Sequence, residues 1–320
     1  LDSTDIRVTC PETPCLLDIK LTGWREGHRA CVRVANNHTN IIYMERDGDI
    51  LRELPVTGNA EDHLQDKSVL NVRDIITFAE TVPIDAILPT VGRQIEKNPA
   101  IAAEGLRNSW GANIGSTLLE SSQDWATQAR AWAAAGSDAR MNGCEMPVVI
   151  VSGSGNQGIT ATMPVVAAAR WLGIDEPTML RAVTLSNLIA IRIKSKFGRL
   201  SNLCGATVAG TGAACGITYL LGGGYHEICC AIQNMVGNVT GMVCDGAKAD
   251  CALKISTCVN AACQAAAMGT RGVRVQSTDG IVEENVERTL DNFAILSTHG
   301  TSDSVILDLM LNKEHTPDAE

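Results

Sequence analysis

The chain has 320 residues, 45% of them hydrophobic, so it can bury a sizeable core in one large domain or in a small domain beside a larger one. Its 26 basic and 36 acidic side chains give a net charge of −10, which would repel nucleic-acid phosphates and anionic lipid surfaces. No apolar run approaches the roughly 20 residues that span a bilayer. We therefore expect no nucleic-acid partner and no membrane partner.

Twelve cysteines raise the question of disulfides. The chain is long, rich in alanine and glycine, and shows no secretory signal pattern, so reduced thiols in the cytoplasm are the better interpretation. Most of them should pack as small core residues. The sequence also lacks an initiating methionine, which suggests that it begins partway through a gene product.

Residues 1–66 contain short runs rich in β-branched side chains, separated by turn signals such as Pro11, Gly23 and Gly48. These runs predict a small antiparallel sheet. From about Leu70 the hydrophobic period lengthens to three and four residues, which is typical of a helix. We place a boundary near residue 66 and expect a predominantly α-helical domain over 67–320, so the fold class is α+β.

The helical part is punctuated by glycines. Breaks are expected at Gly136, Gly173, the triplet 222–224 and Gly280. Helices are predicted over 116–135, 158–172, 177–194, 225–237, 248–268 and 281–297.

The segment PVVIVSGSGNQG, residues 147–158, has glycines in G-x-G-x-x-G spacing after an apolar run. A dinucleotide site would also need a second strand ending in an acidic residue, whereas a further helical pattern follows. Backbone N–H groups at a helix N-terminus could equally hold a carboxylate, and a simple packing turn is also possible. The candidate substrate-binding residues are Ser152, Gly153, Ser154, Gly155, Asn156 and Gln157.

Two further residues are candidates for catalysis. Arg140 lies in SDARMNG after the expected break at Gly136, where a guanidinium could clamp a carboxylate or form an ordinary salt bridge with Asp138. His38 stands where a strand should begin, and its usual pKa suits general acid or base work, although most isolated histidines are structural.

Cysteines gather in two later segments. Paired C-x-x-C knuckles, which mark structural zinc, are absent from the sequence. Cys244 precedes a predicted helix, where N–H groups would favour a thiolate. Cys251 and Cys258 share one helix face, so core packing is their default interpretation, with Cys251 kept as a possible ligand. The candidate metal ligands are Cys204, Cys244 and Cys251.

Four segments together resemble the L-cysteine desulfidases, which are relatives of the iron–sulfur serine dehydratase alpha chain. They are SDARMNG (137–143), SGSGNQGITATMPV (152–165), RLSNLCGA (199–206) and GMVCDGAKADCALK (241–254). The resemblance also takes in WGANIGSTL at 110–118 and the strand start at His38. It implies a 4Fe–4S cluster held by three cysteines, with one iron open to substrate.

By position, Cys204 and Cys244 match two of the family's cluster ligands. The remaining ligand of the desulfidases lies in a Gly-Cys-Thr-Glu-Pro motif, which does not occur in these 320 residues. The resemblance therefore implies that the family's first segment is missing from this sequence. Cys251 could take the place of the third ligand.

The activity implied by the resemblance is β-elimination from a small amino acid, with L-cysteine giving sulfide, ammonia and pyruvate. L-serine dehydration and a non-catalytic binding homologue without the cluster are the alternatives. We expect no pyridoxal phosphate, because Lys194, Lys196, Lys248 and Lys254 lack the context of a Schiff-base lysine. A homo-oligomer is expected, and the chain could also pair with the missing N-terminal segment.

Overall fold

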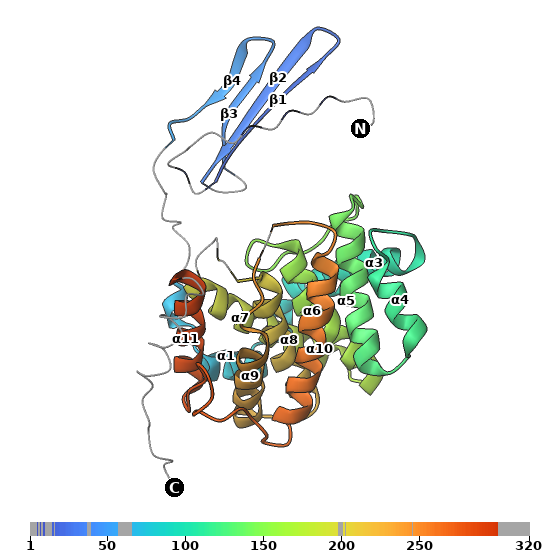
Figure 1. Ribbon diagram of the computed structural model, residues 1–320, viewed down its shortest axis with the longest axis vertical. Helices are drawn as coiled ribbons and strands as arrows, with labels where there is room; N and C mark the ends of the chain where they lie inside the picture. Colours follow the sequence, from blue (N-terminus) through green and yellow to red (C-terminus); the bar gives the residue numbers. More distant parts are fainter. Residues whose placement is uncertain are drawn as a thin grey trace. The chain divides into compact units, whose positions relative to one another are not determined.

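The computed structural model describes residues 5, 7, 9, 15, 17–36, 40–56, 66–197, 201, 203–244 and 246–299. The chain divides into two compact units, Leu1–Asp66 and Lys67–Glu320. The first unit contains a four-stranded antiparallel sheet and the second is predominantly helical (Figure 1). The expected α+β fold class is confirmed.

The sheet is a meander in which β1 (Asp18–Arg25), β2 (His28–Ala35), β3 (Ile41–Arg46) and β4 (Asp49–Glu53) follow one another in chain order. Two tight turns close the first and last hairpins, at Glu26–Gly27 and Asp47–Gly48. Both residues of each turn have positive φ, between 53° and 93°. This is the type I′ geometry whose twist matches that of the flanking strands, and it favours glycine at the second position.

The register of the sheet separates two faces. Leu21 pairs with Val32 on one face, and Cys31 pairs with Thr22 on the other. Ile19 and Leu21 are 55% and 72% exposed, whereas Cys31 is 1% exposed. One face of the sheet is therefore apolar and exposed, and the other carries buried residues.

The helical unit begins with the short 3-10 helix η1 (Lys67–Val69). Its helices are α1 (Val72–Thr81), α2 (Ile84–Ile87), the π-helical turn η2 (Leu88–Gly92), α3 (Arg93–Arg107), α4 (Ile114–Ser121), α5 (Trp125–Met141), α6 (Gly155–Leu172), α7 (Glu176–Phe197), α8 (Gly205–Leu220), α9 (Tyr225–Val239), α10 (Cys251–Gly269) and α11 (Val286–His299). Side chains cap several N-termini: Asn71 accepts from Asp74 N–H, and Asp124 accepts from Thr127 N–H.

Helix α8 lies among α6, α7, α9 and α10 in the middle of this unit, and most of its residues are buried (Figure 1). Its glycines allow very close packing. A Cβ on Gly212 would lie 2.3 Å from the backbone oxygen of Ser186, and one on Gly216 would lie 2.8 Å from that of Ala182. The backbones of α7 and α8 are thus in contact, which explains the high content of small residues.

Several sequence-based boundaries are corrected. Gly136 does not end a helix, because α5 continues through it to Met141. Gly136 is buried, and a Cβ there would lie 3.1 Å from Ile159, so this glycine serves helix packing rather than termination. The single helix predicted over 116–135 is two helices, with Asp124 capping the second. Helices α3 and α8 were not predicted.

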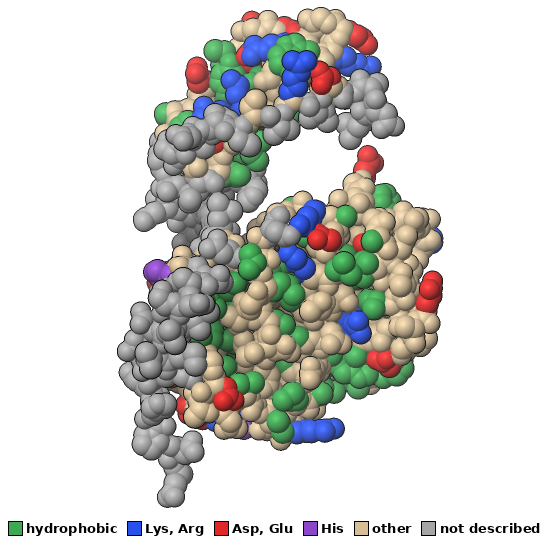
Figure 2. Space-filling model, viewed as in Figure 1, with side chains coloured by type: hydrophobic (Ala, Val, Ile, Leu, Met, Phe, Trp, Pro, Cys, Tyr) green, Lys and Arg blue, Asp and Glu red, His purple; other side chains and the backbone are tan. Residues whose placement is uncertain are grey.

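The breaks at Gly173 and Gly222 are confirmed, and both glycines have positive φ. Within the described residues no single helix is long and apolar enough to cross a membrane. One pair, Val72–Thr81 with Ile84–Arg107, satisfies length and composition together but is bent by 113°. On the face of the helical unit in Figure 2, charged side chains are scattered among uncharged ones.

Candidate functional site

The glycine-rich segment forms a tight turn that leads into α6. Ser152 and Gly153 both have positive φ, 50° and 80°, and Val151 and Ser154 form an isolated bridge across the turn. The Ser154 hydroxyl then accepts from Gln157 N–H as the N-cap of α6. Residues 145–195 contain this bridge, α6 and α7, so they lack the strand–helix–strand order of a dinucleotide site.

Arg140 lies in the last turn of α5, not in the loop that the sequence suggested, and its guanidinium lies over the start of α6. Its Nη1 donates to Asn156 Oδ1 at 3.2 Å. A Cβ on Gly155 would lie only 2.2 Å from the Nε of Arg140, so glycine is required for this approach. An exposed guanidinium and a helix N-terminus are both positive, and together they favour an anion.

Asp138 is not the partner of Arg140. Its Oδ2 accepts from Ile114 N–H at 2.8 Å and from Gly115 N–H at 3.4 Å, which caps the start of α4. Asp138 is fully buried, and burial raises the pKa of its carboxyl while these N–H groups oppose the shift. The alternative of a salt bridge between Arg140 and Asp138 is therefore wrong. Asp138 instead connects α5 to the start of α4.

The segment before the turn is held by Asn98 of α3, which is fully buried. Val149 N–H donates to Asn98 Oδ1 at 2.9 Å, and Asn98 Nδ2 donates to the Val149 oxygen at 3.2 Å. The same Nδ2 group also reaches Thr162 Oγ1 at 3.3 Å. A Cβ on Gly158 would lie 2.1 Å from the Val149 oxygen, so this strip of backbone fits directly onto α6.

Gln157 connects the turn to the first cysteine. Its side chain is 7% exposed, and a Cβ on Gly205 would lie 2.8 Å from its Nε2. Gly205 is the first residue of α8, and Cys204 is the N-cap of that helix. The N-termini of α6 and α8 therefore meet through the Gln157 carboxamide.

Cys204 and Cys244 are brought together by a short backbone pairing. Leu203 and Val243 form an isolated antiparallel bridge, and Cys204 N–H donates to the Met242 oxygen at 2.9 Å. With strands about 4.8 Å apart and a rise of about 3.3 Å per residue, this pairing separates the two cysteine Cα atoms by roughly 8 Å. Burial raises the pKa of the Cys204 thiol, and the charges of Cys244 and Cys251 act in the same direction.

Two lysine side chains lie close to this pair of thiols. Lys194, at the end of α7, is half-buried and donates to Ser201 Oγ at 3.2 Å. Burial lowers the pKa of its ammonium group, while the charges of Cys244 and Cys204 oppose the shift. Lys254 donates to the Val243 oxygen at 3.0 Å and counteracts the rise in the pKa of Cys204. From sequence these lysines were candidates only for a Schiff base, and their position beside the thiols was not predicted.

The fit of these residues to a three-cysteine cluster is partial. Cys251 is the first residue of α10, and its Sγ lies 3.9 Å from the Gly246 oxygen. Across the described parts of the chain, no three His, Cys, Asp or Glu side chains converge in a way that could hold a metal ion. The site thus supplies a neighbouring pair of thiols, Cys204 and Cys244, and not a complete ligand set.

The remaining predicted residues have simpler placements. His38 lies outside the described residues. Cys215, Cys258 and Cys263 are buried in the helical core, and burial raises the pKa of the Cys263 thiol to about 12. Such thiols are inert packing residues, as the sequence suggested for most of the twelve.

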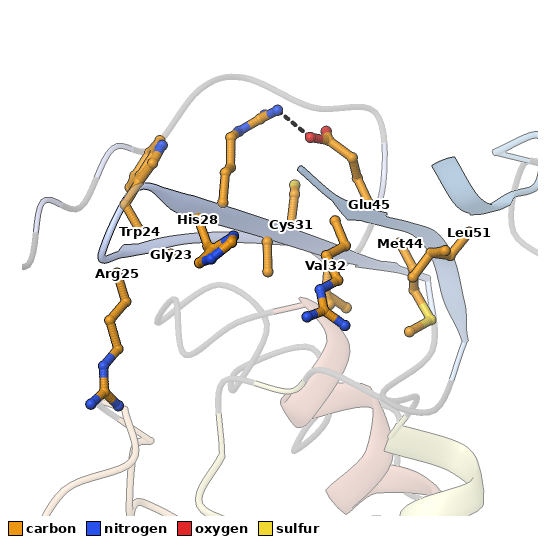
Figure 3. Close-up of a pocket in the computed structure, with 12 residues that line it drawn as sticks. Gly23, Trp24, Arg25, His28, Cys31, Val32, Met44, Glu45 and Leu51 are labelled. Carbon is orange, nitrogen blue, oxygen red and sulfur yellow. Dashed lines mark hydrogen bonds and ion pairs between the residues drawn. The ribbon is translucent and has the colours of Figure 1, made fainter. Parts of the chain in front are cut away.

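A pocket of about 440 Å³ lies on the sheet and contains none of the predicted site residues (Figure 3). Trp24, His28 and Met44 are among the side chains that line it. Its charged groups are paired locally, since Arg29 and Glu45 form an ion pair and Tyr43 donates to Glu45 at 3.0 Å. The chemistry of the chain is therefore better sought around Cys204.

Residues 28–305 match the family model described as serine dehydratase alpha chain. The chain belongs to the serine dehydratase alpha chain family. A UPF0597 protein of Lachnoclostridium phytofermentans is 46% identical over 284 residues, which cover 88% of this chain and 68% of that protein. A UPF0597 protein of Desulfitobacterium hafniense is 41% identical over 316 residues, covering 98% of this chain and 74% of that protein.

A UPF0597 protein of Treponema denticola is similar at 39% identity over 309 residues, covering 94% and 72% of the two chains. The names of these relatives state no activity. Membership of this family confirms the resemblance to the serine dehydratase alpha chain that was found in the sequence. The resemblance to the L-cysteine desulfidases stays a prediction.

Proposed function

We propose that this chain carries the catalytic domain of a lyase that performs β-elimination on a small amino acid, with L-cysteine as the substrate. The observation that supports this most directly is the contact of Gln157 with Gly205. This contact joins the N-terminus of α6, whose backbone N–H groups would favour an anion, to a neighbouring pair of thiols. The serine dehydratase alpha chain domain points to the same class of reaction.

The substrate carboxylate would bind where Arg140 lies over the N-terminus of α6. The guanidinium donates to Asn156 in the free protein and has further N–H groups with which to clamp a carboxylate. Anchoring the carboxylate there directs the Cβ substituent along Gln157 towards Cys204 and Cys244. Fixing both ends of a small molecule in this way is a large part of what an enzyme contributes to rate.

The reaction removes the α-proton to a base and breaks the bond between Cβ and sulfur. The resulting aminoacrylate tautomerises to an imine, and water releases ammonia, so cysteine and water give sulfide, ammonia and pyruvate. A 4Fe–4S cluster, when bound through Cys204, Cys244 and a further ligand, would supply a Lewis-acidic iron for the leaving group. The ammonium groups of Lys194 and Lys254 stabilise negative charge beside these cysteines.

The test uses the full-length protein prepared without oxygen. Iron and acid-labile sulfide are assayed, and sulfide and pyruvate release from L-cysteine is compared with pyruvate release from L-serine. Cys244→Ala should abolish both the cluster and turnover. Cys229→Ala is the matched control, because the charged neighbours of Cys229 are Arg73 and Glu287 rather than the proposed ligands.

Cys251→Ala decides the third ligand: loss of iron from this variant assigns Cys251 to the cluster, and retention excludes it. Undiminished sulfide release from Cys244→Ala would refute the cluster-dependent reaction. Faster turnover of L-serine than of L-cysteine would show that L-serine is the substrate, and the assignment of the reaction as β-elimination would stand.

A second function is favoured by one observation, the absence of a complete metal-binding set among the described residues. A homologue that binds a small amino acid without cleaving it would retain Arg140 and the α6 N-terminus and would not need the thiols. For such a protein, anaerobic preparations would contain no iron, and calorimetry would show amino-acid binding that persists in the Cys244→Ala variant.

A further inference from the structure

Gln157 is the third residue of α6, where a glutamine side chain commonly accepts a hydrogen bond from the backbone N–H of the N-cap residue. Ser154 and Gln157 have the spacing of a capping box, in which the side chain of the third helical residue accepts from the N-cap N–H. Half of the box is present, because Ser154 Oγ accepts from Gln157 N–H at 3.4 Å. The other half is missing, because Ser154 N–H donates to the Val151 oxygen at 3.1 Å instead.

Released from capping, the Gln157 side chain extends to the N-terminus of α8. Its Nε2 and Cδ lie 2.8 and 2.9 Å from the place of a Gly205 Cβ. In that position Oε1 is fully buried and has no hydrogen-bond partner among the residues that the structure describes. A buried acceptor without a donor destabilises the folded state, so stability does not explain this arrangement.

The group that Oε1 lacks is a hydrogen-bond donor, and Gln157 itself lies between Arg140, which contacts the start of α6, and Cys204, at the start of α8. An α-amino acid bound with its carboxylate at Arg140 and its Cβ substituent towards Cys204 presents its α-ammonium group in that interval. Ammonium has three donors and no acceptor, which complements an unpaired carbonyl oxygen.

We propose that Gln157 is the residue that selects amino acids over other small carboxylates, with its Oε1 accepting a hydrogen bond from the substrate α-ammonium. This inference rests on the proposed function of the site. It assigns to Gln157 a role in substrate binding, separate from the cluster ligands and from the carboxylate anchor.

The test compares two ligands that differ only in this group, L-cysteine and 3-mercaptopropionate, on full-length wild-type protein and on Gln157→Met. Methionine keeps the length and shape of the side chain and removes the carbonyl acceptor. The KM for L-cysteine should rise roughly 10- to 100-fold, as expected for a lost hydrogen bond to a charged group. The inhibition constant of 3-mercaptopropionate should stay within about two-fold of the wild-type value, because that ligand lacks the ammonium group.

A second measurement separates recognition from structure. Because Oε1 has no donor within the described part of the chain, Gln157→Met should leave the Tm measured without ligand unchanged or raise it. A fall in Tm, an equal weakening of both ligands, or no change in either constant would overturn the inference. Gly205→Ala provides a second variant: the three atoms nearest to its Cβ would all belong to the Gln157 side chain, so it should shift the same ratio of constants in the same direction.

The two proposals fail in different ways. If wild-type protein shows no turnover, calorimetric binding of the same two ligands gives the ratio. A preference for L-cysteine that disappears in Gln157→Met then supports the inference although the lyase reaction has failed. If wild-type protein turns over L-cysteine and Gln157→Met keeps the same preference, only the role of Gln157 is refuted. Binding of neither ligand by wild-type protein would refute both.

Discussion

Replacing Asn98 with alanine should release the strip of backbone that leads into the glycine turn. Asn98 is fully buried and makes three hydrogen bonds, two of them to the backbone of Val149 and one to Thr162. At about 1 kcal/mol each, their loss costs about 3 kcal/mol, and the stranded groups of Val149 add to this. The better helix propensity of alanine returns about 0.6 kcal/mol. The net loss in the free energy of unfolding should be about 2–4 kcal/mol.

Urea unfolding followed by circular dichroism measures this loss, with Asn108→Ala as the control. Asn108 lies at the end of the same helix, is exposed, and donates to Glu104 at 2.6 Å, so its replacement should cost less than about 0.5 kcal/mol. Asn98→Ala should also weaken ligand binding at Arg140, because the turn that positions α6 loses its support. A loss of less than about 0.5 kcal/mol would show that Asn98 does not hold this segment.

Three further predictions follow from single contacts. Hydrogen bonds from a neighbouring hydroxyl and from a backbone N–H lower the pKa of Asp124 from 3.8 to about 2, so its contribution to stability is present above pH 3.8 and is lost as pH falls towards 2. In Asp124→Asn, urea unfolding across that range should show a shallower loss of stability than in wild type. Gly212→Ala places a Cβ 2.3 Å from a backbone oxygen of α7 and should lower stability by about 1–3 kcal/mol or more, whereas Gly241→Ala, with open space around it, should be near neutral in thermal unfolding. Gly155→Ala should displace the exposed guanidinium of Arg140 and raise the KM with little change in Tm, and an unaltered KM would contradict the carboxylate site.

The fold was predictable where local pattern decided it. Alternating β-branched runs with Gly48 at a turn predicted the sheet, and three- and four-residue spacing after Leu70 predicted α1. Helix α8 was missed because all of its faces are buried, so its sequence has no polar face to mark a helical period. Gly136 was taken for a helix end because a glycine that packs against α6 and a glycine that ends a helix are alike in sequence.

In the candidate site, too, features set by local sequence could be predicted and features set by helix packing could not. A helix N-terminus beside the glycine turn could be predicted from spacing along the chain, although α6 begins at Gly155 and not at the expected residue 158. The position of Lys194 beside Cys204, and of Gln157 against Gly205, depends on how α6, α7 and α8 pack, and no periodicity reports such packing. The segments WGANIGS and SDARMNG are also connected only by packing, because the Asp138 carboxylate of the second caps α4, which begins in the first. Residues that looked like separate motifs are thus two ends of one hydrogen bond, which fixes α5 and therefore the place of Arg140.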